Sequence, residues 1–92
     1  MKIEFDPVKI GKNTHERGLP FELVKEFEWE TALVAADTRA TYPEPRFVAL
    51  GMIGARLHVV CFTPIPHGIR VISFRKANDR EVKRHAQKTI HQ

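Results

Sequence analysis

The sequence predicts one α+β domain: a short edge strand, two N-terminal helices, a four-stranded antiparallel meander and a C-terminal helix. The chain has 92 residues, of which 42% are hydrophobic, enough for one modest core but not for two. Its apolar residues gather in runs of strand length between segments that carry helix start and stop signals. This order of elements favours a single domain over residues 1–92 with helices on one face of a sheet.

The N-terminal part is expected to begin with the edge strand, Lys2 to Phe5, where polar and apolar residues alternate. Asp6 and Pro7 then supply an N-cap and a proline at the first helical position, which predicts a helix from Pro7 to about Arg17. A second short helix is predicted from Pro20 to about Phe27, because apolar residues recur along one of its faces. These residues are Phe21, Val24 and Phe27.

Four apolar-rich segments of strand length follow, joined by short connections that are rich in turn formers. Connections this short suit hairpins rather than crossovers, so the strands are expected to form an antiparallel meander. The predicted strands are roughly Ala32–Asp37, Arg46–Met52, Arg56–Thr63 and Ile69–Lys76.

The segment after the last strand matches a capping box, with Asn78 as N-cap and Glu81 at the third helical position. A helix should therefore open here and run to about Ile90. Val82, Ala86 and Ile90 recur at helical spacing and are predicted to be its buried stripe.

Charge is distributed unevenly along the chain. Residues 1–45 carry a net charge of −3 and residues 46–92 a net charge of +7, within an overall charge of +4. Asymmetry of this kind is the electrostatic footprint expected of a protein that binds a polyanion. The strand-to-helix segment from Ile69 to Glu81 alone carries four cations, so it is the first place to look for an anion site.

Cysteine content, hydropathy and the absence of ligand-binding motifs limit which disulfides, compartments and cofactors are expected. The single cysteine, Cys61, excludes an intrachain disulfide. Neither a signal peptide nor a run of about 18 apolar residues is visible, so no membrane association is expected and the cytoplasm is the expected compartment. The sequence has no residue spacing typical of a zinc site and no glycine-rich nucleotide loop. We therefore predict that the chain binds no metal and no cofactor.

An ordered set of residues runs from about Ile3 to His85. Its most specific part is Ile69-Arg70-Val71-Ile72-Ser73, followed by Arg75-Lys76-Ala77 and Arg80-Glu81. The other members are Phe5-Asp6, Lys9, Asn13, Gly18, Phe21, Phe27, Asp37, Glu44, Arg46, Gly51, Leu57 and Thr63. Together these residues and their spacing resemble the BrnT family of toxins.

The resemblance implies a RelE-like fold and a bacterial type II toxin–antitoxin system, in which the toxin is a ribonuclease that halts translation. It also implies a BrnA-type antitoxin, similar to ribbon-helix-helix proteins, that neutralises the toxin and binds operator DNA as part of their complex. Three positions depart from the family pattern. Glu16-Arg17 stand where Lys-His is usual, His85 stands for a tyrosine, and Pro64-Ile65-Pro66-His67 replaces a basic hairpin tip.

Metal-independent RNA cleavage requires a base for the 2′-hydroxyl, an acid for the 5′-oxygen and cations facing the phosphate. RelE-like enzymes use Lys, Arg and an aromatic or histidine residue for this, and arginine suits the role because its planar fork binds phosphate bidentately. The resemblance therefore implies catalytic roles for Arg75, Arg46, Arg70 and His85, and RNA binding by Lys76, Arg80, Lys83, Arg84 and Lys9. The alternative is that these are ordinary solvated cations.

Strand periodicity makes a sharper prediction for the arginines. One face of the last strand carries Arg70, Ile72, Phe74 and Lys76, and the other carries Ile69, Val71, Ser73 and Arg75. Arg70 and Arg75 are thus expected on opposite faces unless a bulge intervenes. Arg75 is favoured as the catalytic arginine, because peptide N–H groups at the helix start attract anions there, although Asp79 and Glu81 compete for those donors.

Two histidines deserve comparison. A helical contact between Glu81 and His85 would raise the pKa of His85 and orient its ring; the alternative is an exposed pair without consequence. His58 lies within a strand and is interpreted as a partly buried, hydrogen-bonded histidine.

Three hypotheses follow. The first is an endoribonuclease toxin that cuts single-stranded or ribosome-presented RNA and leaves a 2′,3′-cyclic phosphate. The second is a non-catalytic, operator-regulating partner of an antitoxin. The third is a nucleic-acid-binding domain without an antitoxin, whose binding would fall steeply with salt.

Overall fold

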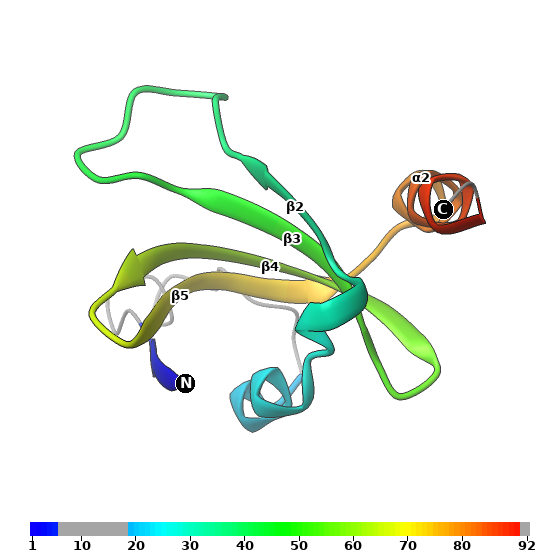
Figure 1. The fold of residues 1–92 in the computed structure, drawn as a ribbon, viewed down its shortest axis with the longest axis horizontal. Helices are drawn as coiled ribbons and strands as arrows, with labels where there is room; N and C mark the ends of the chain where they lie inside the picture. Colours follow the sequence, from blue (N-terminus) through cyan, green and yellow to red (C-terminus); the bar gives the residue numbers. More distant parts are fainter. Residues whose placement is uncertain (6–18, 91–92) are drawn as a thin grey trace.

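The computed structural model describes residues 1–5 and 19–90 of the chain, built around one five-stranded mixed sheet (Figure 1). The strand order is β1-β5-β4-β3-β2. Strands β2 to β5 pair with their sequence neighbours in antiparallel fashion, and β1 pairs with β5 in parallel. The strands are β1 (Lys2–Phe5), β2 (Leu33–Ala36), β3 (Phe47–Ile53), β4 (Arg56–Ile65) and β5 (Gly68–Lys76).

The predicted four-stranded antiparallel meander is wrong, because β1 adds a fifth, parallel strand. Gly68 permits this pairing: it lies opposite Lys2, and a Cβ atom at Gly68 would approach the carbonyl oxygen of Lys2 to 1.8 Å. The N–H of Lys2 also donates to the carbonyl oxygen of His67 at 2.9 Å. The parallel pairing therefore depends on a residue without a side chain at the start of β5. The strand positions themselves were predicted to within two residues.

The second predicted N-terminal α-helix is also wrong. The segment from Pro20 to Phe27 forms a 3₁₀ helix, η1 (Phe21–Glu26), rather than an α-helix, and a second 3₁₀ turn, η2 (Trp29–Thr31), follows it. Apolar residues at intervals of three explain this, because a helix with three residues per turn places them on one line. The other predicted helix, Pro7 to about Arg17, lies outside the described residues.

The C-terminal helix agrees with the sequence prediction. Helix α2 (Asp79–Ile90) begins at the predicted capping box and, at 12 residues, is too short to span a bilayer. The predicted buried stripe is wrong, however, because Val82 is 42% exposed and Ala86 is exposed as well. Ile90, the third residue of that stripe, has a side chain outside the described part of the structure. Between Asp79 and Lys88 the partly buried residues are Glu81 and His85, so this polar side of the helix is turned toward the sheet.

The two faces of the sheet differ. Helix η1 lies on one side and α2 on the other (Figure 1). The core face, on the side of η1, carries the main apolar cluster, which includes Val24, Phe27, Val60, Phe62, Val71 and Phe74. Phe27 packs so closely on Gly51 that a Cβ atom there would lie 2.4–2.9 Å from its ring. Trp29 packs edge-on against Phe62 at 5.4 Å between ring centroids, as expected of a core residue.

A β-bulge interrupts the pairing of β4 with β5. Cys61 lies opposite Ser73, but the next residue of β4, Phe62, lies opposite Val71, so Ile72 is the extra residue on β5. An extra residue reverses the alternation of side chains on either side of it. This bulge decides which arginines of β5 share a face.

Candidate functional site

The bulge at Ile72 brings Arg70 and Arg75 to the same face of the sheet. Arg70 lies opposite Thr63 and Arg75 opposite Val59 on β4. Directly opposed residues share a face, and positions four apart on an unbroken strand do too. The predicted division of these arginines between opposite faces is therefore wrong, because the extra residue restores their alignment.

Arg46 joins them from the other side of β4. It directly precedes β3, in which Phe47 lies opposite Phe62 on the core face, so Arg46 shares the opposite face with Val48. We call this second side of the sheet the arginine face. Arg46, Arg70 and Arg75 lie around its margin, and Val48, Cys61 and Ser73 lie at its centre. Burial raises the pKa of the Cys61 thiol, which stays protonated there.

At one end of the arginine face, Arg75 is held by the start of α2. Its Nη1 and Nη2 donate to Oε1 and Oε2 of Glu81, each at 2.8 Å. Glu81 also completes the capping box: Asn78 N–H donates to Oε1 of Glu81, and Glu81 N–H donates to Oδ1 of Asn78, both at 2.9 Å. The predicted capping box is thus confirmed. One carboxylate joins the arginine to the helix cap.

The charge of Glu81 is correspondingly stabilised. Hydrogen bonds from Arg75 and from the backbone of Asn78 hold the pKa of Glu81 below its ordinary value, although burial opposes this. Arg75 itself remains 45% exposed. The pair is therefore accessible to an incoming anion.

His85 lies one turn beyond Glu81 on the side of α2 that faces the sheet. Its Nε2 lies 3.3 Å from the carbonyl oxygen of Thr31. Side chains four residues apart on a helix are neighbours, so His85 and the Arg75–Glu81 pair belong to the same end of the face. Together they supply an imidazole, a carboxylate and a guanidinium.

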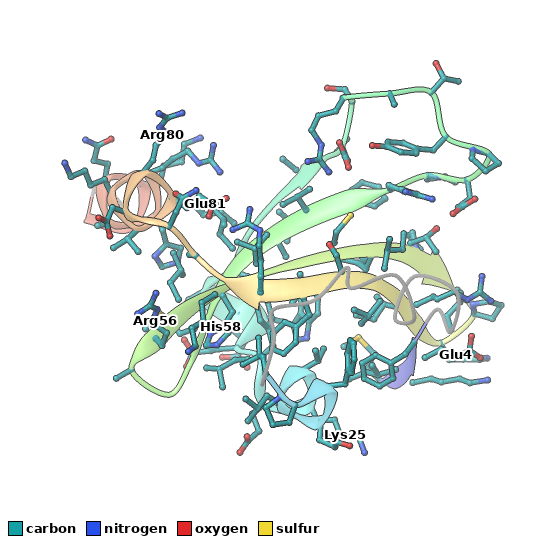
Figure 2. All side chains as sticks on the ribbon, turned by 180° about the vertical axis from the view of Figure 1, so that it is seen from behind. Glu4, Lys25, Arg56, His58, Arg80 and Glu81 are labelled. Atoms are coloured by element: carbon teal, nitrogen blue, oxygen red, sulfur yellow. The ribbon has the colours of Figure 1, made fainter. Side chains whose placement is uncertain are left out.

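The other predicted cations of α2 point elsewhere. Arg80 projects away from the sheet, whereas Glu81 projects toward it (Figure 2). Lys83 lies three residues after Arg80 and so shares its outward side. Lys76 lies opposite His58, on the core-face side of β5, and Lys9 lies outside the described residues. Lys76, Arg80 and Lys83 are therefore separated from the arginine face, whereas Arg84 extends toward β2 and β3.

At the other end of the face, a buried carboxylate organises the turn between β2 and β3. The Asp37 side chain is 1% exposed, and Arg39 binds it with two hydrogen bonds, Nε to Oδ1 at 2.8 Å and Nη2 to Oδ2 at 2.7 Å. The Tyr42 hydroxyl donates to Oδ2 at 3.3 Å, and the Cys61 thiol lies 3.9 Å away. Arg39 holds the pKa of Asp37 well below its usual range.

Arg46 lies beside this cluster. Its guanidinium carbon is 4.2 Å above the centre of the Tyr42 ring, and its Nη2 is 3.5 Å from Oε1 of Glu44. The side chain is 15% exposed, and its Nε is buried without a hydrogen-bond partner. Buried donors without a partner are rare in folded proteins, and each calls for an explanation. Arg46 is thus fixed by stacking while one donor remains unsatisfied.

Asp37, Arg39 and Tyr42 were not among the site residues that sequence reasoning selected. An aspartate directly after an apolar strand, with an arginine two residues later, is a local signal that points to this pairing. The contribution of Tyr42 depends on how the turn folds back, so no local pattern reveals it.

Arg70 forms a third, more exposed pair at the edge of the sheet. Its Nη2 lies 3.3 Å from Oε2 of Glu4 on β1, and Glu4 also pairs with Lys2 at 3.1 Å. Arg70 and Glu4 are directly opposed in the parallel register of β1 and β5. The addition of β1 therefore gives Arg70 a partner that the predicted meander lacked.

The three arginines cannot all contact one phosphate group. Val59 and Thr63, which face Arg75 and Arg70, are four residues apart, or about 13 Å along the strand. A nucleic-acid strand with successive phosphates can contact such spaced cations, whereas a small anion can contact only one end. The geometry thus fits a polymeric anion.

His58 is buried, as the sequence predicted. It is 3% exposed, its Nδ1 lies 2.9 Å from the carbonyl oxygen of Arg56, and its ring stacks on Phe74 at 5.5 Å. This places it on the core face, away from the arginines.

A comparison with protein families gives the chain an identity at the level of the family. The model for the family described as "Ribonuclease toxin, BrnT, of type II toxin-antitoxin system" matches residues 5–81. The chain belongs to the BrnT family. No curated protein and no solved structure matches it. An antitoxin partner and an RNA substrate follow for this BrnT-family chain from the type of system. The matched region includes all three arginines and Glu81, whereas His85 lies beyond it.

Proposed function

We propose that the chain is a metal-independent endoribonuclease toxin that cleaves RNA on its arginine face. One observation carries this proposal: the bulge at Ile72 aligns Arg70 and Arg75 on the face that also holds Arg46. Family membership supplies the substrate class, and the spacing of the arginines suits a strand with successive phosphates. Guanidinium groups fixed in this way stabilise charge that develops on a phosphate.

The proposed reaction is attack of a ribose 2′-oxygen on the adjacent phosphorus. The bond between 2′-oxygen and phosphorus forms as the bond between phosphorus and 5′-oxygen breaks. The 2′-hydroxyl proton passes to a base, and an acid protonates the leaving 5′-oxygen. The products are a 2′,3′-cyclic phosphate and a 5′-hydroxyl end, so no water is consumed in this step.

His85 and Arg75 are the proposed reacting residues. An imidazole takes or gives a proton near neutral pH, and His85 lies at the same end of the face as Arg75. A phosphate must compete with Glu81 for Arg75, because both Nη atoms already bind that carboxylate. The proposal therefore includes a shift of Arg75 from Glu81 to the RNA.

Arg46 and Arg70 are proposed to hold neighbouring phosphates rather than the reacting one. The remaining predicted RNA-binding cations are proposed to act over a longer range, since they raise the local concentration of RNA through their charge. These are Lys76, Arg80, Lys83, Arg84 and Lys9. The proposed partner is a BrnA-type antitoxin of the ribbon-helix-helix kind, and operator DNA is bound only through the complex.

The test uses the purified chain with RNA in the presence of EDTA. Fragments that end in a 2′,3′-cyclic phosphate are expected from free RNA or from RNA on ribosomes, together with growth arrest when the chain is expressed. Arg75→Ala should suppress both effects. If neither free nor ribosome-bound RNA is cut, the enzymatic proposal is wrong.

One observation favours the alternative of a non-catalytic, operator-regulating partner of the antitoxin. Both Nη atoms of Arg75 are bound by Glu81, which is the arrangement of a structural arginine. On that reading Arg75→Ala would lower stability and operator binding by the complex. Neither the unchanged chain nor the Arg75→Ala variant would produce RNA fragments.

A further inference from the structure

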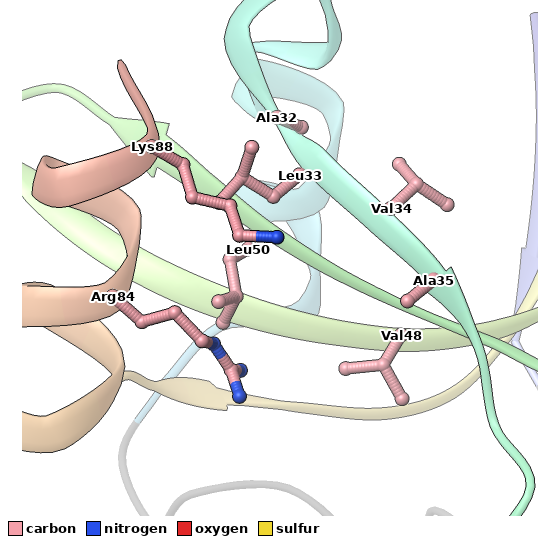
Figure 3. A pocket seen from close by; sticks show the side chains of 8 residues that line it. All are labelled: Ala32, Leu33, Val34, Ala35, Val48, Leu50, Arg84 and Lys88. Atoms are coloured by element: carbon pink, nitrogen blue, oxygen red, sulfur yellow. The ribbon is translucent and has the colours of Figure 1, made fainter. Parts of the chain in front are cut away.

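A groove separates α2 from strands β2 and β3. It encloses about 370 Å³, and its aliphatic floor includes Leu33, Val48 and Leu50 (Figure 3). Arg84 and Lys88 line it from the helix side, and both side chains extend from α2 toward the strands. The groove thus combines an apolar floor with a cationic wall.

The charge of this wall is not balanced by the groove itself. No acidic residue among those that the structure describes lines the groove. Within residues 1–5 and 19–90, no carboxylate lies within ion-pair distance of Arg84 or Lys88. Two cations beside an apolar floor are complementary to a segment that carries carboxylates next to aliphatic side chains.

The strand side of the groove is also open to a partner. β2 ends the order of the described sheet, so one row of its peptide groups points away from β3. Val34 of β2 lines the groove and is 51% exposed. Exposed apolar side chains on an edge strand are typical of sites where another protein adds an extended segment.

We propose that this groove binds an acidic, aliphatic-rich segment of a protein partner, with its carboxylates on Arg84 and Lys88 and its aliphatic side chains on the floor. The partner that we assign is the antitoxin, an assignment that rests on the proposed toxin function. RNA fits less well, because the described lining of the groove holds no aromatic ring on which a base could stack.

A segment bound in the groove would lie close to the proposed RNA site. Arg84 lies three residues after Glu81, so a segment bound along the groove lies beside the Arg75–Glu81 pair. Binding in the groove thus inhibits by covering the end of the arginine face where the RNA is proposed to react.

Two substitutions test the groove without touching the proposed RNA residues. Lys88→Glu reverses a charge of its wall, and Ala35→Asp places an acid opposite Val48 on its floor. Each should weaken the affinity for the purified antitoxin about tenfold or more, measured by titration calorimetry. RNA cleavage by the free chain should be unchanged. Both residues are exposed, so the variants should fold, which a thermal melt checks.

Matched controls lie outside the groove. Lys25→Glu reverses an exposed lysine on η1, on the other side of the sheet (Figure 2), and Val82→Asp changes an exposed valine of α2. Neither should alter antitoxin affinity. A loss as large as that of Lys88→Glu would overturn the proposal, since it would indicate a general effect of net charge.

Peptides identify the occupant. Overlapping antitoxin peptides of about 10 residues, which span roughly 30 Å when extended, are titrated against the chain. An acidic, aliphatic-rich peptide should bind, and Lys88→Glu should weaken it. The proposal is overturned if the groove variants bind antitoxin normally, if they instead lose RNA binding, or if they lose only self-association in sedimentation. Failure to cleave RNA, with antitoxin binding still lost in the groove variants, would contradict the enzymatic proposal alone.

Discussion

The two ends of the arginine face hold their arginines in different ways. At the end formed by the turn between β2 and β3, Arg46 is stacked on Tyr42, mostly buried, and keeps an unsatisfied Nε, while Asp37 is neutralised by a different arginine, Arg39. At the end formed by α2, Arg75 is nearly half exposed and both of its Nη atoms bind Glu81. One arginine is fixed by packing, the other by an ion pair.

This difference suits the two arginines to different roles in RNA binding and cleavage. A stacked, buried arginine cannot move far, so Arg46 is suited to fixing the position of a bound strand. An exposed arginine such as Arg75 can exchange the carboxylate of Glu81 for a phosphate. We therefore expect the Arg46 end to govern RNA affinity and the Arg75 end to govern the chemical step.

The largest effect is expected from the residues at the Arg75 end. His85→Ala and Arg75→Ala should each lower kcat for RNA cleavage by about 100-fold, because proton transfer and charge stabilisation each contribute roughly this much. KM should change little. Single-turnover cleavage with saturating RNA measures the step directly. A larger loss of kcat in Arg46→Lys than in Arg75→Ala would reverse the assignment of the two ends.

A smaller effect is expected at the Arg46 end. Arg46→Lys keeps the charge but loses the planar group that stacks on Tyr42, and it should weaken RNA binding about tenfold, or 1.4 kcal/mol, with kcat retained. Fluorescence anisotropy with a labelled RNA measures the affinity. Tyr42→Phe is the matched control, since it keeps the ring under Arg46 and removes only the hydroxyl that contacts Asp37.

The link between Arg75 and the helix cap predicts a trade between stability and RNA binding. Glu81→Gln weakens the capping box and the Arg75 pair, so the free energy of unfolding in urea should fall by about 1 kcal/mol. RNA should bind more tightly, because Arg75 no longer has to exchange the Glu81 carboxylate for a phosphate. Glu30→Gln, which removes an exposed acid elsewhere on the surface, should change neither the free energy of unfolding nor the affinity for RNA. Weaker RNA binding in Glu81→Gln would show that the pair itself positions the RNA.

The smallest effect is expected in the response to acid. The pKa values of Asp37 and Glu81 are lowered in the folded chain. At a pH between the folded-state and unfolded-state pKa of either group, the unfolded chain therefore binds more protons than the folded chain. Their stabilising contribution is complete above the ordinary carboxyl pKa of about 4 and declines as the pH falls below it. The free energy of unfolding in urea should therefore differ less between wild type and Asp37→Asn near pH 3 than at neutral pH. An unchanged difference would contradict the lowered pKa of Asp37.

Local signals predicted the elements of this fold that depend on neighbouring residues. The capping box of Asn78 and Glu81 and the positions of β2 to β5 follow from patterns within a few residues. The parallel pairing of β1 did not follow, because it depends on close contact between Lys2 and Gly68 across most of the chain. Likewise η1 adopted the tighter helix that its interval of three permits.

The candidate site was predicted in its composition but not in its arrangement. The arginines were selected from their residue type and the family resemblance, yet their common face depends on one extra residue, Ile72. A bulge is set by how β5 registers against β4, which no pattern within β5 reveals. The Asp37 cluster was missed for the same reason, since Tyr42 and Cys61 reach it from different elements.

The parallel pairing of β1 has a consequence for how the molecule forms. Glu4 and Arg70 are 66 positions apart, so a ribosome releases the first strand long before its partner exists. Contacts this distant in sequence form late and slow the folding of a domain. The arginine face is thus incomplete until the last strand is made. During that interval the newly synthesised chain lacks the assembled surface that we propose cleaves RNA, which leaves time for a neutralising protein to bind it.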